Sequence, residues 1–300
     1  MDVTLDGRVA LITGGSKGLG LAIATRMASS GADVALLARR PEGLAEAQQL
    51  VNPIARGRVH VVACDVSQAA EVERAYHDVL ETLGRVDILV NNAGISQTGA
   101  FASITDAVWQ ADLDLKLFAA IRLARLVWPG MVERRWGRII NVLNTAAKAP
   151  KAGSAPTSVS RAAGLALTKV LAGEGAPHGI LVNALHVGLI DSDQWVRRHA
   201  GKNDDQPYAA FLADMARNIP LGRVGTAEEF ANVACFLASD LAGYVTGTSI
   251  NVDGNLSPVT TANLMPMSGL RMPDRATDVR RFLRLVQVSS AVTRLRMGRV

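Results

Sequence analysis

Short runs of apolar, mostly β-branched residues alternate along the chain with longer stretches whose apolar positions recur every three or four residues. The apolar runs lie at 8–14, 32–38, 58–66, 86–94, 137–144, 180–188 and 249–254. Runs of this length indicate buried strands, and the helical periodicity between them predicts helices. We expect these helices at about 18–31, 41–51, 68–83, 105–134, 156–174 and 226–239, with irregular and helical segments up to about 217 before the last of them.

Regular alternation of strand and helix predicts one α/β domain. Because strands joined through helices require right-handed crossovers, the pattern favours a doubly wound, seven-stranded parallel sheet. The pattern ends after Asp253, so we assign residues 1–258 to this domain and residues 259–300 to a C-terminal extension. The extension contains a basic amphipathic segment, which predicts either a surface-docked or mobile tail or a helix that packs on a partner subunit or an anionic surface.

The positive net charge of the chain lies near its C-terminus rather than in the α/β domain. Eight arginines and two aspartates give residues 271–300 a net charge of +6, which leaves −1 of the chain's total of +5 for residues 1–270. The domain therefore carries no excess of basic residues typical of nucleic-acid binding. Cys64 and Cys235 lie in apolar runs, which predicts buried thiols and a cytoplasmic setting. No apolar run approaches the roughly 18 residues of a membrane helix, so we expect no membrane insertion.

A glycine-rich turn, TGGSKGLG at 13–20, directly follows the first strand and opens the first helix. Glycines let the backbone approach a pyrophosphate, and the helix N-terminus offers unpaired N–H groups to it. This context predicts a Rossmann-type dinucleotide site. The candidate cofactor-binding residues of the turn are Gly14, Ser16, Lys17, Gly18, Leu19 and Gly20.

Further motifs lie at the distances expected of one family. Asp65 and Val66 follow the third strand, and the NNAG turn containing Asn92, Ala93 and Gly94 ends the fourth. VNALHVGLIDS at 182–192 and the closing segment from 220 to 254 complete the set. Together these motifs resemble the short-chain dehydrogenase/reductase family over residues 5–258. The resemblance implies that Asp65 and Val66 hold the adenine, and that Gly188, Ile190 and Ser192 lie beside the nicotinamide.

The end of the second strand indicates which dinucleotide is chosen. A carboxylate there would hold the ribose 2′-hydroxyl of NAD, but this chain has Ala38 followed by Arg39. A guanidinium and the ammonium of Lys17 suit a 2′-phosphate instead. We therefore predict NADP(H) as the cofactor, with Lys17 and Arg39 contacting its phosphate, and we predict no metal site.

The positions that carry catalysis in the resembled family are all substituted. The family uses Asn, Ser, Tyr and Lys, and by register this chain has, in that order, Lys116, Asn144, Thr157 and Arg161. Asn144 keeps the ability to donate to an oxyanion, and Arg161 keeps positive charge near the nicotinamide ribose. An aliphatic hydroxyl is a much weaker acid than a phenol, so Thr157 is better suited to pass a proton on than to supply it.

Two side chains are candidates for supplying that proton. A lysine in a partly dry site beside Arg161 has its pKa depressed by desolvation and like charge, so Lys116 is a candidate general acid through Thr157 or water. Equally, Lys116 is suited to binding the cofactor in place of the family's lysine. His186 is a second candidate acid, although a neutral histidine satisfied by the backbone explains it as well.

Three functions remain open at this point. The first is an NADP(H)-dependent oxidoreductase that acts on a carbonyl or hydroxyl group of a small molecule through this rebuilt proton pathway. The second is an NADP(H)-binding protein without redox turnover, and the third a hydrolase, lyase or isomerase that reuses the cleft. Residues 192–220 occupy the place of the family's substrate lid, with Trp195, Tyr208 and Phe211 as a candidate apolar wall. The resemblance also implies a homo-oligomer, a dimer or tetramer.

Overall fold

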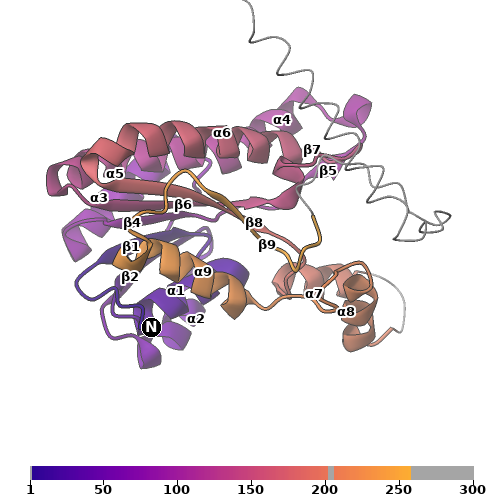
Figure 1. The fold of residues 1–300 in the computed structure, drawn as a ribbon, viewed down its shortest axis with the longest axis horizontal. Coiled ribbons are helices and arrows are strands. Elements are labelled where there is room, and N and C mark those ends of the chain that lie inside the picture. Colours follow the sequence, from indigo (N-terminus) through magenta and orange to yellow (C-terminus); the bar gives the residue numbers. More distant parts are fainter. Residues whose placement is uncertain (1, 202–205, 258–300) are drawn as a thin grey trace, which may run out of the picture. The chain divides into compact units, whose positions relative to one another are not determined.

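The structure, a computed structural model, describes residues 2–201 and 206–257. All seven expected strands form one parallel sheet in the order β3-β2-β1-β4-β6-β8-β9 (Figure 1). The strands are β1 (Val9–Thr13), β2 (Asp33–Ala38), β3 (Val59–Ala63), β4 (Ile88–Asn91), β6 (Gly137–Asn144), β8 (Ile180–Val187) and β9 (Ser249–Val252). Every pairing within this sheet is parallel, which confirms the predicted Rossmann-type fold.

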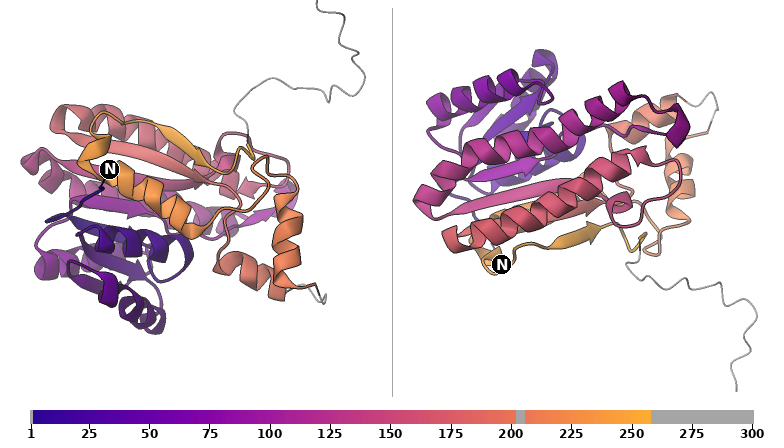
Figure 2. Two further views of the ribbon diagram at one scale, coloured as in Figure 1. Left: turned by 60° about the horizontal axis from the view of Figure 1, so that its bottom comes forward. Right: turned by 90° about the horizontal axis from the view of Figure 1, so that it is seen from above.

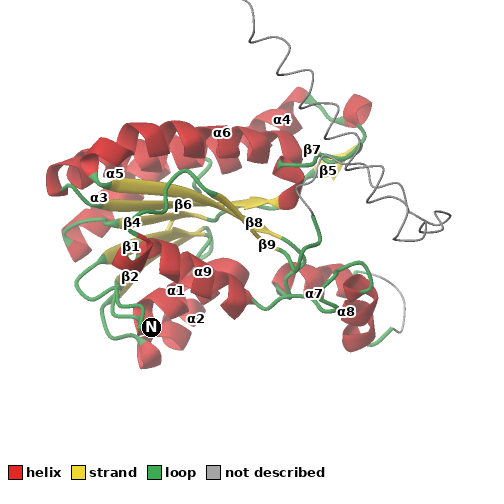
Figure 3. Ribbon diagram, viewed as in Figure 1, coloured by secondary structure: helices red, strands yellow, loops and turns green. Residues whose placement is uncertain are grey.

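Nine α-helices accompany the strands within the described part of the chain (Figure 3). They are α1 (Gly18–Ser29), α2 (Pro41–Val51), α3 (Ala69–Leu83), α4 (Asp106–Leu113), α5 (Ala119–Arg134), α6 (Thr157–Gly175), α7 (Asp193–Ala200), α8 (Tyr208–Ala216) and α9 (Ala227–Ala238). No helix of the described residues is long and apolar enough to cross a membrane. The extension predicted at 259–300 lies outside the described residues.

Helices cover the sheet on both faces. One face packs against α1, α2 and α9, and the other against α3, α5 and α6 (Figure 2). The inner strands β1 and β4 are buried along their whole lengths, as is typical of a parallel sheet sandwiched between helices. Strand order reverses between β1 and β4, so the loops that follow these two strands diverge to opposite faces of the sheet. In sheets of this kind, ligands bind at the carboxyl edge beside that reversal.

The long central helix differs from the expectation at one point. The sequence predicts one helix over about 105–134, but a π-helical turn at Asp114–Phe118 separates α4 from α5. A π turn inserts one residue into the helix and changes which side chains face inward. Lys116 lies in the middle of this turn and is buried. Single-turn π-helices occur frequently at functional sites, and this one places the candidate acid.

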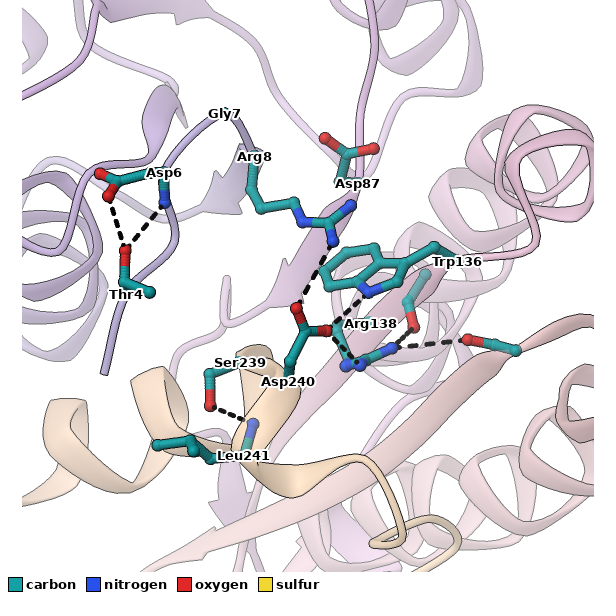
Figure 4. A network of polar contacts seen from close by, with 12 residues as sticks. Thr4, Asp6, Gly7, Arg8, Asp87, Trp136, Arg138, Ser239, Asp240 and Leu241 are labelled. Carbon is teal, nitrogen blue, oxygen red and sulfur yellow. Dashed lines mark hydrogen bonds and ion pairs between the residues drawn. The ribbon is translucent and has the colours of Figure 1, made fainter. Parts of the chain in front are cut away.

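A polar cluster at Asp240 ties the amino ends of β1 and β6 to the segment after α9 (Figure 4). Asp240 accepts a hydrogen bond from Trp136 Nε1 at 2.8 Å and from Arg138 Nη2 at 3.2 Å, and Arg8 Nη2 lies 3.6 Å away. The guanidinium carbons of Arg8 and Arg138 lie 3.7 and 4.2 Å from the centre of the Trp136 ring. We refer to Arg8, Trp136, Arg138 and Asp240 as the Asp240 cluster.

Candidate active site

The glycine turn has a backbone conformation that requires glycine at two positions. Gly14 and Gly18 have positive φ values of 64° and 53°, a region that favours glycine. A Cβ on Gly20 would lie 2.1 Å from the carbonyl oxygen of Gly14, so the start of α1 packs directly under the turn. The turn can therefore bring its backbone close to a ligand at the N-terminus of α1.

The NNAG turn after β4 is joined to the glycine turn by hydrogen bonds. Asn92 Nδ2 donates to the carbonyl oxygens of Thr13 and Gly14 at 2.9 and 3.3 Å. The backbone N–H groups of Asn92 and Ala93 both donate to the hydroxyl of Thr13. These bonds hold the two loops of the strand-order reversal in one fixed arrangement.

A cleft of about 440 Å³ opens between these loops at the carboxyl edge of the sheet. The loops after β1, β4, β6 and β8 contribute to its lining. Most predicted cofactor-binding residues lie along it: Gly14, Lys17, Gly18, Leu19, Asn92, Ala93, Gly94, Arg161, Gly188, Ile190 and Ser192. A predicted catalytic pair, Asn144 and Thr157, lines the same cleft. Most of the residues predicted to bind the cofactor and two of the residues predicted to act in catalysis therefore line one cleft.

A second cavity, of about 460 Å³, lies beside α4 and contains two further predicted residues. Arg39 and Asp65 line it, and the carboxylate of Asp65 accepts hydrogen bonds from the backbone and hydroxyl of Ser67. Three other predicted cofactor-binding residues, Ser16, Gly20 and Val66, line neither the cleft nor this second cavity. Gly20 supports the turn from below, and Val66 is buried in the core.

Lys116 and Thr157 are in direct contact. The side chain of Lys116 is 1% exposed, and its Nζ donates to the Thr157 hydroxyl at 2.7 Å. Burial lowers the pKa of Lys116 to about 8; the bond and charge of Asp112 oppose this shift, and the charge of Arg161 adds to it. The sequence predicts a lowered pKa for Lys116, in agreement with this direction. At neutral pH the ammonium is present and is acidic enough to give up a proton.

Arg161 lies against the NNAG turn. Its Nη1 donates to the carbonyl oxygen of Val142 at 2.7 Å, and a Cβ on Gly94 would lie 2.3 Å from its Nη2. Burial lowers the pKa of Arg161 to about 10, against the charge of Asp112. The guanidinium of Arg161 stays charged near neutral pH and places a positive charge at the lining of the cleft.

Asn144 has a free hydrogen-bonding capacity at the cleft. Its buried side-chain Oδ1 has no hydrogen-bond partner among the described residues. Buried polar atoms are nearly always paired, so an unpaired one that belongs to a cleft-lining residue indicates a ligand group. This atom and the glycine cradle fit the polar groups of a bound dinucleotide and its substrate.

His186 has a different environment from the other candidate catalytic residues. It is fully buried, with Nδ1 2.7 Å from the carbonyl oxygen of Asn144 and Nε2 2.8 Å from the hydroxyl of Ser249. Burial lowers its pKa, and it does not line the cleft. Both ring nitrogens are therefore occupied, which favours the structural interpretation of His186 over a role as acid.

The predicted lid comprises α7 and α8. Trp195 lines the cleft, and its ring centre lies 6.4 Å from that of Phe211. Tyr208 and Phe211 stack with ring centres 6.1 Å apart, and the Tyr208 hydroxyl donates to Asp191. Of the three predicted wall residues, Trp195 thus lines the cleft, whereas Phe211 packs against Trp195 and Tyr208 packs against Phe211.

The structure adds residues to the site that sequence reasoning missed. The carboxylate of Asp112 accepts hydrogen bonds from Lys116 and, at 2.6 Å, from the hydroxyl of Ser160. The Thr157 hydroxyl makes two hydrogen bonds with the backbone of Gln97. It donates to the Gln97 carbonyl oxygen at 2.7 Å and accepts from the Gln97 N–H at 2.9 Å. The spacing of Asp112 and Lys116, four residues apart on a predicted helix, was a signal that could have identified this pair.

Comparison with known proteins supports the same family as the geometry. Residues 14–257 match the family described as enoyl-(acyl carrier protein) reductase. The chain is 33% identical over 257 residues to the 3-oxoacyl-(acyl-carrier-protein) reductase of Aquifex aeolicus, covering 85% of this chain and all of that protein. It is also 35% identical over 247 residues to the acetoacetyl-CoA reductase of Shinella zoogloeoides, covering 82% of this chain and 97% of that one.

Two solved structures are similar to the chain over the same region. The L-sorbose reductase of Gluconobacter frateurii, in complex with NADPH and L-sorbose, is 36% identical with a TM-score of 0.82. An NADPH-bound short-chain oxidoreductase of Pseudomonas aeruginosa, described as containing an atypical catalytic center, is 38% identical with a TM-score of 0.79. Each match covers 85% of this chain and 98% of the other.

The dinucleotide cleft, the parallel sheet and these matches define a class of oxidoreductase fold. The chain belongs to the short-chain dehydrogenase/reductase family.

Proposed function

We propose that this protein is an NADP(H)-dependent oxidoreductase that interconverts a carbonyl and a hydroxyl group on a small molecule, using Lys116 as the source of the proton. The observation that carries the proposal is the 2.7 Å hydrogen bond from Lys116 Nζ to Thr157, whose hydroxyl belongs to a cleft-lining residue. The pair supplies an acid and a carrier at the site where the family's tyrosine acts. The assembly into dimers or tetramers stays a prediction.

The cofactor assignment rests on the cleft and on the relatives. Two similar solved structures hold NADPH. In this chain the exposed Lys17 lies at the glycine turn, and the exposed Arg39 follows β2, where a carboxylate would favour NAD. When bound, NADPH supplies the hydride that reduces the carbonyl carbon. The cofactor would be held by the glycine turn, the NNAG turn and Arg161.

The chain's own residues have separate tasks in this proposal. Thr157 gives its hydroxyl proton to the developing alkoxide as it receives one from Lys116. The side-chain amide of Asn144 donates to the same oxygen and stabilises its charge, a contribution that is worth about 3 kcal/mol in other enzymes. Arg161 positions the nicotinamide ribose through its fixed charge.

A second candidate is a protein that binds NADP(H) without turnover. One observation favours it: the Thr157 hydroxyl already donates to the carbonyl oxygen of Gln97 at 2.7 Å. Its proton must leave that bond before it reaches a substrate. This geometry would make Thr157 a structural anchor for the loop that contains Gln97 rather than a proton carrier.

The two candidates are separated by binding and single-turnover measurements on the purified protein. We expect NADPH to bind more tightly than NADH in paired fluorescence titrations. We also expect NADPH oxidation at the nicotinamide absorbance band with at least one member of a panel of ketones, aldehydes and quinones. In Lys116→Met, oxidation should fall by a factor of about 10²–10⁴, the usual contribution of general acid catalysis, with unchanged NADPH affinity.

The pH profile provides the internal check. Because the acid is the protonated form, and because the pKa of Lys116 is about 8, turnover should be constant below pH 8 and fall above it. Lys116→Met should remove this descending limb, whereas Lys169→Met, at an exposed position of α6, should keep it. Tight NADPH binding without oxidation of any panel member would support the second candidate instead.

A further inference from the structure

Asp112 is a buried carboxylate in contact with the proposed proton donor Lys116. Its side chain is 2% exposed. It accepts hydrogen bonds from the Lys116 ammonium and the Ser160 hydroxyl, and the Thr157 hydroxyl lies 3.4 Å from its Oδ1. A buried carboxylate with this set of donors is held in one orientation, and it faces Lys116 from one helical turn earlier.

The cluster of Asp112, Lys116, Thr157 and Ser160 lies between two neighbouring spaces, both of which Ile95 lines. Thr157 lines the cofactor cleft, whereas Asp112 lines the second cavity beside α4. Lys116 lines neither and lies between the two. A continuous hydrogen-bonded path therefore runs from Asp112, which lines the second cavity, through Lys116 to the hydroxyl of Thr157, which lines the cleft.

Lys116 depends on Asp112 for its charge. The other ionic group that acts on Lys116 is Arg161, whose like charge disfavours the ammonium, and the hydroxyls of Thr157 and Ser160 are neutral. Removing one partner of a buried ion pair leaves the other charge uncompensated, so a lysine without Asp112 would lose its proton readily. Asp112 is thus the group that keeps the candidate acid in its active form.

We propose that Asp112 is a positioning residue that holds Lys116 protonated against Thr157, and that protons reach Lys116 from the second cavity through Asp112. The inference rests on the proposed function. It adds the route by which the acid is restored, through the cavity that the predicted cofactor-binding residues Arg39 and Asp65 also line.

The step balances as one hydride and one proton per carbonyl reduced. The carbonyl carbon gains the hydride supplied by NADPH, and the carbonyl oxygen takes the proton of Thr157. The Thr157 oxygen takes a proton from the Lys116 ammonium, which becomes a neutral amine. A hydronium ion or buffer acid of the solvent in the second cavity protonates the Asp112 carboxylate, and Asp112 passes that proton to the amine. This restores the ammonium and the carboxylate, and one solvent proton is consumed per carbonyl reduced.

The first test measures Lys116 directly, without cofactor or substrate. NMR titration of ¹³C-labelled lysine side chains, with Lys116→Met to assign the signal, reports the pKa of Lys116 in the full chain. In Asp112→Asn we expect this pKa to fall by at least about one unit, because an amide of the same shape lacks the compensating charge. Asp112→Glu keeps the charge and should restore a value close to that of the unchanged protein.

Asp114→Asn is the matched control. Asp114 lies two residues along the same helix and lines the same cavity, but its carboxylate bonds Gln110 and Arg122 instead of Lys116. It should leave the Lys116 titration unchanged. An equal shift in both asparagine variants, or none in Asp112→Asn when circular dichroism shows a folded protein, would overturn the proposal.

The second test addresses the route. Val108 lines the second cavity, which Lys116 does not line, so Val108→Phe should narrow the cavity while leaving the titration of Lys116 unchanged. With a pH indicator in a stopped-flow turnover at saturating NADPH, we expect at least about tenfold slower proton uptake and an unchanged first hydride transfer. Unchanged proton uptake would contradict the route. A shifted Lys116 titration in Asp112→Asn without NADPH oxidation would contradict the proposed function alone.

Discussion

Gly20 and Gly94 illustrate how tightly the cleft is built at the scale of single residues, because a Cβ at either position meets a neighbour. At Gly20 the neighbours are the Gly14 carbonyl oxygen at 2.1 Å and Asn92 Nδ2 at 2.6 Å. At Gly94 the neighbour is the end of the Arg161 side chain at 2.3 Å. Backbone cannot move aside without distorting the turn, whereas a guanidinium on a long side chain can rotate away.

Alanine substitutions at these two glycines should therefore have different effects. Gly20→Ala should lower the free energy of unfolding by about 1–3 kcal/mol and weaken NADPH binding at least tenfold, since overpacking displaces the phosphate turn. Gly94→Ala should lose less stability but should move Arg161, and so reduce turnover more than folding. Chemical denaturation and NADPH titration of both variants provide the comparison. Equal stability losses would show that Arg161 is as rigid as the backbone.

The residue scale also shows what sequence reasoning reached and what it missed. Register along the motifs located Lys116, Thr157 and Arg161, and the structure brings them together beside Asn144. Register alone did not reveal Asp112, because it lies where the resemblance implies no functional residue. Its importance depends on the burial of Lys116, which is a tertiary property.

At the scale of elements, periodicity identified the seven strands and the helices against them, because long, repeating patterns of apolar positions reflect the packing of each element on the sheet. Two features were not predicted. The two-residue strands β5 (Thr98–Gly99) and β7 (Ala155–Pro156) are too short to have a periodic pattern. The π turn at Asp114–Phe118 keeps helical periodicity on both sides, so the inserted residue is not visible in the sequence.

The Asp240 cluster links elements that are far apart along the chain, and its removal should affect stability rather than turnover. The side chain of Arg138 is 5% exposed, and burial lowers its pKa to about 10, against the charge of Asp240. Asp240→Ala leaves this cation without its carboxylate. Because Asp240 itself is 71% exposed, solvent screens the pair, and we expect a loss of about 1–2 kcal/mol in the free energy of unfolding.

Asp214→Ala, on α8, removes an exposed ion pair with Arg217 and an exposed hydrogen bond from Gln206, and is the control for this variant. Surface pairs contribute little, so the control should change stability by less than about 0.5 kcal/mol. Urea denaturation measures both variants, and single-turnover rates should match the unchanged protein for Asp240→Ala. A stability loss no larger than that of the control would show that the cluster is not a structural link.

At the scale of the whole molecule, the separation of charge along the sequence predicts a division of roles. The residues that line the cleft and the second cavity all lie between Gly14 and Leu256. The positive charge lies beyond them, in residues 271–300. Folding and cofactor binding should therefore depend on the domain assigned to residues 1–258, and attraction to anionic surfaces should depend on the extension.

A chain ending at residue 258 tests this division. Because residues 259–270 carry no charge, truncation should change the net charge from +5 to the −1 of residues 1–270. We expect the truncated protein to keep its melting temperature within about 2 °C, less than the shift that 1 kcal/mol produces in a domain of this size. Its NADPH affinity should also be unchanged, while retention on anionic vesicles at low salt should disappear.

A full-length variant with glutamine at the eight arginine positions of residues 271–300 separates the effect of charge from that of chain length, because it should lose vesicle retention in the same way. If truncation instead weakens NADPH binding or lowers the melting temperature by more, the extension is part of the folded domain and the boundary at 258 is wrong.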